Sequence, residues 1–158
     1  MNVLFVCTGN ICRSPLAEAL LLREVTARSL DGMKVSSAGT GAWDGAPASE
    51  GAYLVGLEHD LDLSAHRARL LTRDMVRQAH LIFTMSRHHR ARVQELDPEA
   101  RVVLLGEYAG RSGPEAEVSD PFGGDLDVYR LTFAELDELV RVAAGRLVEE
   151  RRASDSGD

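Results

Sequence analysis

Two residues, Cys7 and Arg13, have the types and the spacing of a catalytic anion-binding loop. Five residues separate the thiol from the guanidinium, and the apolar run at residues 3–6 is typical of a buried strand. Ser14 and Pro15 are typical of a helix start, as N-cap and first helical residue. A loop between a strand and a helix N-terminus can direct its backbone N–H groups at an anion, and a neighbouring Arg favours a thiolate. The sequence therefore predicts a Cys7 thiolate in an oxyanion-binding loop.

The expected loop suits a phosphate monoester, because fork-shaped Arg geometry and amide donors bind a tetrahedral dianion from several sides. Cys7 would attack phosphorus to give a phosphocysteine, while Arg13 stabilises the transition state. An acid for the leaving group and a base for water must come from elsewhere in the chain. No metal and no cofactor are required. Cys7 and Cys12 make a poor metal pair, because the chain has no other Cys and no His cluster lies nearby in sequence.

Residues 7–15, with the sequence CTGNICRSP, resemble the phosphate loop of the low-molecular-weight protein phosphatase family. The resemblance extends along nearly the whole chain in the family's order, through residues 37–40 with Trp43, residues 66–69, and the Asp-Pro pair at residues 120–121. It implies a phosphorylated protein as the substrate and inorganic phosphate as the product.

The resemblance also implies a role for each matching residue. Cys7 would be the nucleophile, Arg13 the transition-state clamp and Asp120 the general acid. The residues expected to bind phosphate are Thr8, Gly9, Asn10, Ile11, Cys12, Arg13 and Ser14. Those expected to support the loop are Asn10, Ser14 and His66, with His66 bonding to Asn10. The expected pocket walls are Ile11, Trp43 and Phe122.

The residues around the expected pocket leave two substrates open. Ile11 is what the phosphotyrosine branch of the family carries, whereas the branch with bacterial protein arginine phosphatases typically has Thr there. Thr8 and the stretch at residues 120–127 resemble that arginine branch, and Gly123 stands where tyrosine-specific eukaryotic members carry a second aromatic. We expect a protein-tyrosine phosphatase, with protein arginine phosphatase as the alternative.

Two functions outside this class remain less favoured. An arsenate reductase on the same fold would need a further Cys in the C-terminal half, and no Cys follows Cys12. A non-catalytic phosphoprotein-binding module would be suggested by the loss of Cys7 or Asp120, and both are present.

The composition is that of one globular domain. The chain has 158 residues, of which 44% are hydrophobic and 27% charged, with a formal net charge of −7. We expect a single domain over residues 1–152, a frayed tail over residues 153–158, a cytoplasmic location and no membrane interaction.

Arginines cluster within residues 66–92, but no aromatic residues interleave with them as in a nucleic-acid-binding surface, so no nucleic-acid partner is expected.

Strand and helix patterns alternate along the chain. Strands are expected at residues 2–6, 34–38, 80–84 and 101–105, and helices at residues 14–30, 48–57 and 87–96. The last helix has an apolar face from Tyr129 to Leu147, and Thr132 with Glu135 could form a capping box that starts it afresh. Alternation of this kind predicts an α/β fold with a parallel sheet and helices on both faces, and the family resemblance implies that this sheet is doubly wound. The family resemblance implies four strands, and ligands of such sheets bind at the carboxyl ends of the strands.

Overall fold

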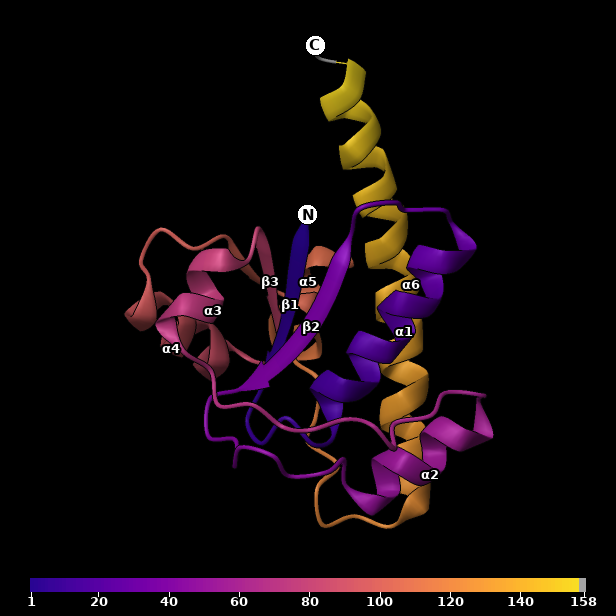
Figure 1. Cartoon of the computed structure of the whole chain (residues 1–158). Helices are drawn as coiled ribbons and strands as arrows, with labels where there is room; N and C mark the ends of the chain where they lie inside the picture. Colours follow the sequence, from indigo (N-terminus) through magenta and orange to yellow (C-terminus); the bar gives the residue numbers. More distant parts are fainter. Residues whose placement is uncertain (157–158) are drawn as a thin grey trace.

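Four parallel strands form one sheet in the order β2-β1-β3-β4 (Figure 1). The computed structural model describes residues 1–156. The two central strands, β1 and β3, are almost wholly buried and mostly apolar, as expected where both faces of a parallel sheet are covered, whereas the edge strands β2 and β4 are fully buried only toward their carboxyl ends. The strands are β1 (Asn2–Cys7), β2 (Lys34–Gly39), β3 (Leu81–Thr84) and β4 (Val102–Leu104).

Helices cover both faces of the sheet. Successive side chains of a strand point to opposite faces, so apolar side chains of β1 pack against helices on each side. Val3 and Phe5 of β1 belong to one core cluster, which they share with α1, α2, α5 and α6. Leu4 and Val6 belong to a second cluster with α3 and α4 on the other side (Figure 1). The helices are α1 (Arg13–Ala27), α2 (Glu50–Glu58), α3 (Arg73–Gln78), α4 (Arg87–Leu96), α5 (Leu105–Tyr108) and α6 (Leu126–Ser156), with a 3-10 turn, η1 (Gly113–Ala116).

This architecture confirms the predicted doubly wound α/β sheet of four strands. All four strands lie within about two residues of their predicted bounds, and α4 has the predicted bounds. The short α3 and α5 were not predicted; α3 is one turn and a half long and contributes only Val76 to the core. A helix of that length carries too little apolar periodicity to be recognised. Within residues 1–156 no helix is long and apolar enough to cross a membrane.

The last helix differs from the prediction at both ends. α6 is continuous from Leu126, so Thr132 does not begin a new helix. Thr132 is an interior residue of α6, and it is buried. At the other end, α6 continues through Ser156, so residues 153–156 of the predicted tail are helical. Residues 157 and 158 of that prediction lie outside the described residues. The final turns of α6 extend past the sheet (Figure 1).

Candidate active site

The loop that follows β1 lies at the carboxyl edge of the sheet, between Cys7 and the start of α1. Its backbone carbonyls are turned outward, because N–H groups of other segments bind them. The carbonyls of Cys7, Thr8 and Ile11 accept from the N–H groups of Thr40, Gly41 and Ser49, each at 2.9 Å. By contrast, the backbone N–H groups of residues 8–12 have no acceptor within the described residues 1–156. Five free donors in one tight loop form the kind of nest that binds an oxyanion.

Ser14 does not cap the helix as predicted. α1 begins one residue earlier, at Arg13, and Cys12 occupies the N-cap position without a side-chain cap. Pro15 is therefore the third helical residue rather than the first. The Ser14 hydroxyl is unavailable for capping because it lies 2.9 Å from Cys7 Sγ and accepts a hydrogen bond from Asn10. The Ser14 side chain therefore contacts Cys7 and Asn10 of the loop and does not cap α1.

Asn10 is the centre of the loop's internal hydrogen bonds. It is fully buried and adopts a left-handed conformation with φ 57°, which Asn tolerates better than most residues. Its side-chain amide donates to the hydroxyls of Ser14 (2.8 Å) and Ser37 (2.9 Å), and its Oδ1 accepts from the backbone N–H of Arg69 (2.9 Å). Ser37 in turn donates to the Glu18 carboxylate at 2.6 Å.

These bonds determine the direction of the Ser14–Cys7 contact. Because the Asn10 amide already donates to Ser14 Oγ, the Ser14 hydrogen is free to be donated to Cys7 Sγ. Cys7 Sγ thus has a hydroxyl donor aimed at it and lies near the N-terminal end of α1, surroundings typical of a reactive cysteine. The geometry is thus consistent with a reactive Cys7, which is 2% exposed at the floor of its pocket.

His66 makes the contact expected of it. Its Nε2 lies 2.6 Å from the Asn10 carbonyl, so this nitrogen carries the hydrogen and donates. His66 and the Arg69 N–H together hold Asn10 from residues that are more than fifty positions away in sequence.

Arg13 is buried and only partly paired. Its Nη1 donates to the Val118 carbonyl at 2.8 Å, and its Nη2 lies 3.6 Å from Asp120 Oδ2. Arg13 Nε is buried and has no hydrogen-bond partner within the described residues. A buried guanidinium N–H without an acceptor is costly, and an oxyanion in the pocket would satisfy it.

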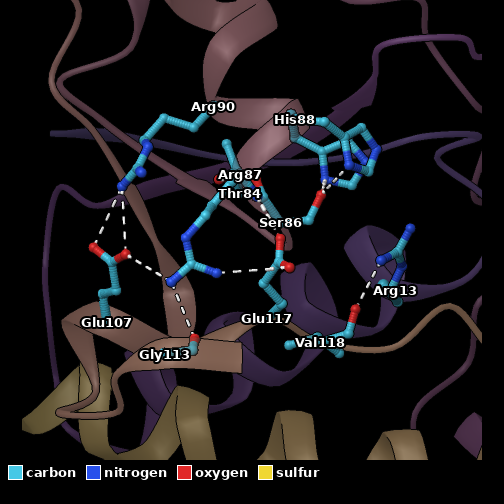
Figure 2. A network of polar contacts seen from close by, with 11 residues as sticks. Arg13, Thr84, Ser86, Arg87, His88, Arg90, Glu107, Gly113, Glu117 and Val118 are labelled. Carbon is cyan, nitrogen blue, oxygen red and sulfur yellow. Dashed lines mark hydrogen bonds and ion pairs between the residues drawn. The ribbon is translucent and has the colours of Figure 1, made fainter. Parts of the chain in front are cut away.

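The two residues Glu117 and Val118, just before Asp120 in the chain, each contact another part of the site. Glu117 accepts from the backbone N–H of Arg87 at 2.7 Å, at the start of α4, and its other oxygen lies 3.6 Å from the Arg87 guanidinium. Figure 2 shows Glu117 between Arg87 and the Val118 carbonyl that binds Arg13. Asp120 itself is half exposed and accepts from the Phe122 N–H at 3.0 Å.

One pocket of about 210 Å³ brings most of the predicted site residues together. Asn10 and Ser14, which were predicted to support the loop, are buried and do not line this pocket. Trp43, predicted as a wall, is not among the lining residues, and its side chain is 85% exposed. The lining residues are Cys7, Thr8, Gly9, Ile11, Cys12, Arg13, Asp120 and Phe122.

Cys12 is a neutral thiol in this pocket. Burial raises its pKa, which outweighs hydrogen bonds to Ser49 Oγ (3.2 Å) and Tyr129 OH (3.3 Å) that act in the opposite direction. The same burial raises the pKa of Tyr129 to about 12. The two cysteines therefore have different chemistry, and only Cys7 has a donor arrangement suited to a nucleophile. Within residues 1–156 no group of His, Cys, Asp and Glu side chains could hold a metal ion.

Sequence reasoning missed His89. Its side chain is completely buried, and its Nε2 lies 2.8 Å from Thr8 Oγ1 in the catalytic loop. The only sequence signal was its place three residues into an amphipathic helix, where it falls on the same face as buried Val93.

This combination of fold and site defines a class of enzyme, the cysteine-dependent phosphatases built on a small parallel sheet. A model of the low molecular weight phosphotyrosine protein phosphatase family matches residues 2–153, and the chain belongs to that family. It is accordingly a hydrolase and a protein phosphatase of the low-molecular-weight type, which acts on phosphorylated proteins.

Known relatives divide between two activities. The chain is similar to a protein-arginine-phosphatase of Geobacillus stearothermophilus, at 37% identity over 150 residues that cover 95% of this chain and 98% of the relative. It is similar to the low molecular weight protein-tyrosine-phosphatase Wzb of Escherichia coli (strain K12), at 38% identity over 152 residues, 95% of this chain and 97% of Wzb. Among solved structures, a mutant of YwlE arginine phosphatase with a phosphorylated active-site serine aligns with a TM-score of 0.88 at 35% identity, covering 96% of this chain and 99% of that one.

Proposed function

We propose that the protein hydrolyses phosphotyrosine in proteins through a phosphocysteine on Cys7. The observation that carries this proposal is that Cys7, Arg13 and Asp120 line one pocket, and that the buried Nε of Arg13 has no hydrogen-bond partner among residues 1–156. The first is a nucleophile, the second an anion clamp and the third a proton donor, and dephosphorylation requires all three.

In the first step the Cys7 thiolate attacks phosphorus and the bond from phosphorus to the tyrosine oxygen breaks. Asp120, as the acid, gives its proton to the leaving oxygen, so that tyrosine departs neutral. Arg13 and the N–H groups of residues 8–12 bind the three remaining phosphoryl oxygens as their charge shifts.

In the second step the Asp120 carboxylate takes a proton from water while the water oxygen attacks phosphorus. The sulfur–phosphorus bond breaks, inorganic phosphate leaves and the Cys7 thiolate is restored, with Ser14 donating to it. The proton acquired in the second step prepares Asp120 for the next cycle. No metal or cofactor takes part in this scheme.

Two apolar side chains support an aryl leaving group. Ile11 and Phe122 both line the pocket, and Phe122 is 67% exposed, so an aromatic ring entering the pocket would cover it. The alternative substrate is phosphoarginine, which is supported by the nearly equal similarity to relatives named for each activity and by Gly123, which stands where tyrosine-specific eukaryotic members carry a second aromatic.

We further propose that residues 1–152 act as one domain and that the enzyme works in the cytoplasm. A catalytic thiol must stay reduced, which the cytoplasm favours, and both cysteines are free.

The test is metal-free turnover of an aryl phosphate in the presence of a chelator, followed by acid quenching during turnover with a phosphorus-labelled substrate. Label bound covalently to a peptide containing Cys7 supports the proposal. Steady turnover without any labelled protein, or turnover that stops when metals are chelated, would contradict it.

A further inference from the structure

Four side chains form a hydrogen-bonded chain that leads from the surface to the catalytic loop. Thr8 Oγ1 lies 2.8 Å from His89 Nε2, and Ser86 Oγ lies 2.8 Å from both His89 Nδ1 and His88 Nδ1. Figure 2 shows Ser86 and His88 at the start of α4. His89 and Ser86 are buried, His88 is exposed, and Thr8 lines the pocket next to Cys7.

Two arrangements of hydrogens let the Ser86 hydroxyl donate within this chain. His89 is neutral, since burial and then the charges of His88 and Arg13 lower its pKa from 6.5 to about 3, so its ring has one N–H. Ser86 has one hydrogen, so when it donates to one imidazole it can only accept from the other. If Ser86 donates to His89 Nδ1, then His89 Nε2–H donates to Thr8 and the Thr8 hydrogen is free. If Ser86 donates to His88, every bond reverses and Thr8 donates to His89.

An anion in the pocket selects between these arrangements, because it accepts hydrogen bonds and repels lone pairs. A free Thr8 hydrogen can be donated to a phosphoryl oxygen, whereas the reverse arrangement presents an oxygen lone pair to the anion. We propose that His89 is a positioning residue that adopts the Nε2–H tautomer in the presence of substrate and holds the Thr8 hydroxyl as a donor to the phosphoryl group. This inference rests on the proposed function, since it assumes that a phosphate occupies the pocket.

The tautomer can be measured directly, without turnover. In wild-type protein labelled with 15N in histidine, imidazole nitrogen shifts distinguish the two tautomers, and the His89→Gln spectrum identifies the His89 signals. With saturating inorganic phosphate, we expect the Nε2–H form of His89. Bound phosphate together with the Nδ1–H form would overturn this inference and leave the proposed function standing. A pocket that does not bind phosphate would overturn both.

A double-mutant cycle tests whether His89 acts through Thr8. We expect Thr8→Val and His89→Leu each to lower kcat/KM about tenfold, as for the loss of one hydrogen bond to a charged group, and the double variant to be no worse than Thr8→Val. Thr8→Ser and His89→Gln retain the donors and should keep most activity. Thr26→Val, on the exposed side of α1, is the matched control and should match the wild type.

Full additivity of the two losses would show that His89 serves the fold alone and would refute the positioning role. If His89→Leu does not fold, Ser86→Ala replaces it in the cycle, because it removes the donor to His89 Nδ1. Its loss in kcat/KM should likewise disappear in the Thr8→Val background, and a loss that persists there would overturn the inference.

Discussion

Arg13 Nη2 lies 3.6 Å from the Asp120 carboxylate, while Nη1 of the same guanidinium binds the Val118 carbonyl two residues earlier at 2.8 Å. One side chain thus contacts both the anion pocket and the segment that carries the proposed acid. Fixing reacting groups relative to each other in this way lowers the entropic part of the barrier. It also means that loss of Arg13 would disturb both phosphate binding and the placement of Asp120.

Cys7→Ser should abolish turnover while phosphate still binds. A serine hydroxyl has no base beside it, since its neighbour Ser14 donates rather than accepts, but Arg13 and the loop N–H groups are unchanged. Calorimetric titration with inorganic phosphate and a single-turnover assay separate the two effects. Turnover near the wild-type level in Cys7→Ser would refute the nucleophile assignment.

Asp120→Ala should reduce activity in proportion to how much the leaving group needs a proton. We expect a loss of about 10²–10⁴ in kcat for a poor leaving group such as tyrosine and little loss for an activated nitrophenol. A series of aryl phosphates with graded leaving groups measures this dependence. Asp74→Ala, a carboxylate removed from the remote α3, is the control; a uniform loss across the series would argue against a general acid.

Ile11→Thr should shift preference from phosphotyrosine toward phosphoarginine. An apolar wall desolvates the N–H groups of a guanidinium without pairing them, and a hydroxyl of similar shape offers an acceptor, so the change in selectivity should be about 1–3 kcal/mol. Values of kcat/KM for both substrates, in wild type and variant, provide the measurement. If the wild type already prefers phosphoarginine, Ile11 is not the discriminator, and Thr8 and Gly123 become the residues to change.

Stability should depend on pH through His89. The unfolded side chain binds a proton below pH 6.5, whereas the folded one, with a pKa of about 3, does not. The unfolded state therefore binds more protons between these values. As the pH is lowered through this range, the free energy of unfolding decreases by up to about 1.4 kcal/mol per pH unit. Denaturant titrations from pH 7 to pH 4 should show a smaller fall for His89→Gln. Parallel curves for the two proteins would contradict a buried neutral His89.

Mild peroxide should inactivate the enzyme reversibly. Oxidation of the Cys7 thiolate gives a sulfenic acid, which can condense with the neutral Cys12 thiol in the same pocket, releasing water and forming a disulfide. Peptide mapping before and after reduction detects the bridge, and Cys12→Ala is the matched variant that should become irreversibly inactive. Sulfinic acid at Cys7 without any bridge would exclude a protective role for Cys12.

Local patterns predicted the strand, the loop and the helix around Cys7, because each depends on neighbours in sequence. Contacts between distant segments were harder to predict. The roles of Ser14 and His89 depend on bonds to Asn10 and Thr8 that no periodicity reveals. The exposed position of Trp43, outside the pocket lining, depends on how its loop is placed. Two arginines of the cluster within residues 66–92, Arg87 and Arg90, pair with Glu107 and Glu117, which lie outside that stretch (Figure 2).

The catalytic loop gains its shape during folding only when its carbonyls bind distant segments of the chain. Cys7 and Arg13 are six positions apart, yet the loop between them is held by residues 40–41, 49, 66 and 69. Closing contacts of such separation is among the slower parts of folding. An early intermediate with only β1 and α1 formed would have every catalytic side chain of the loop but no shaped nest. During refolding, phosphate binding should thus return after most of the helical signal, as a late marker of the native state.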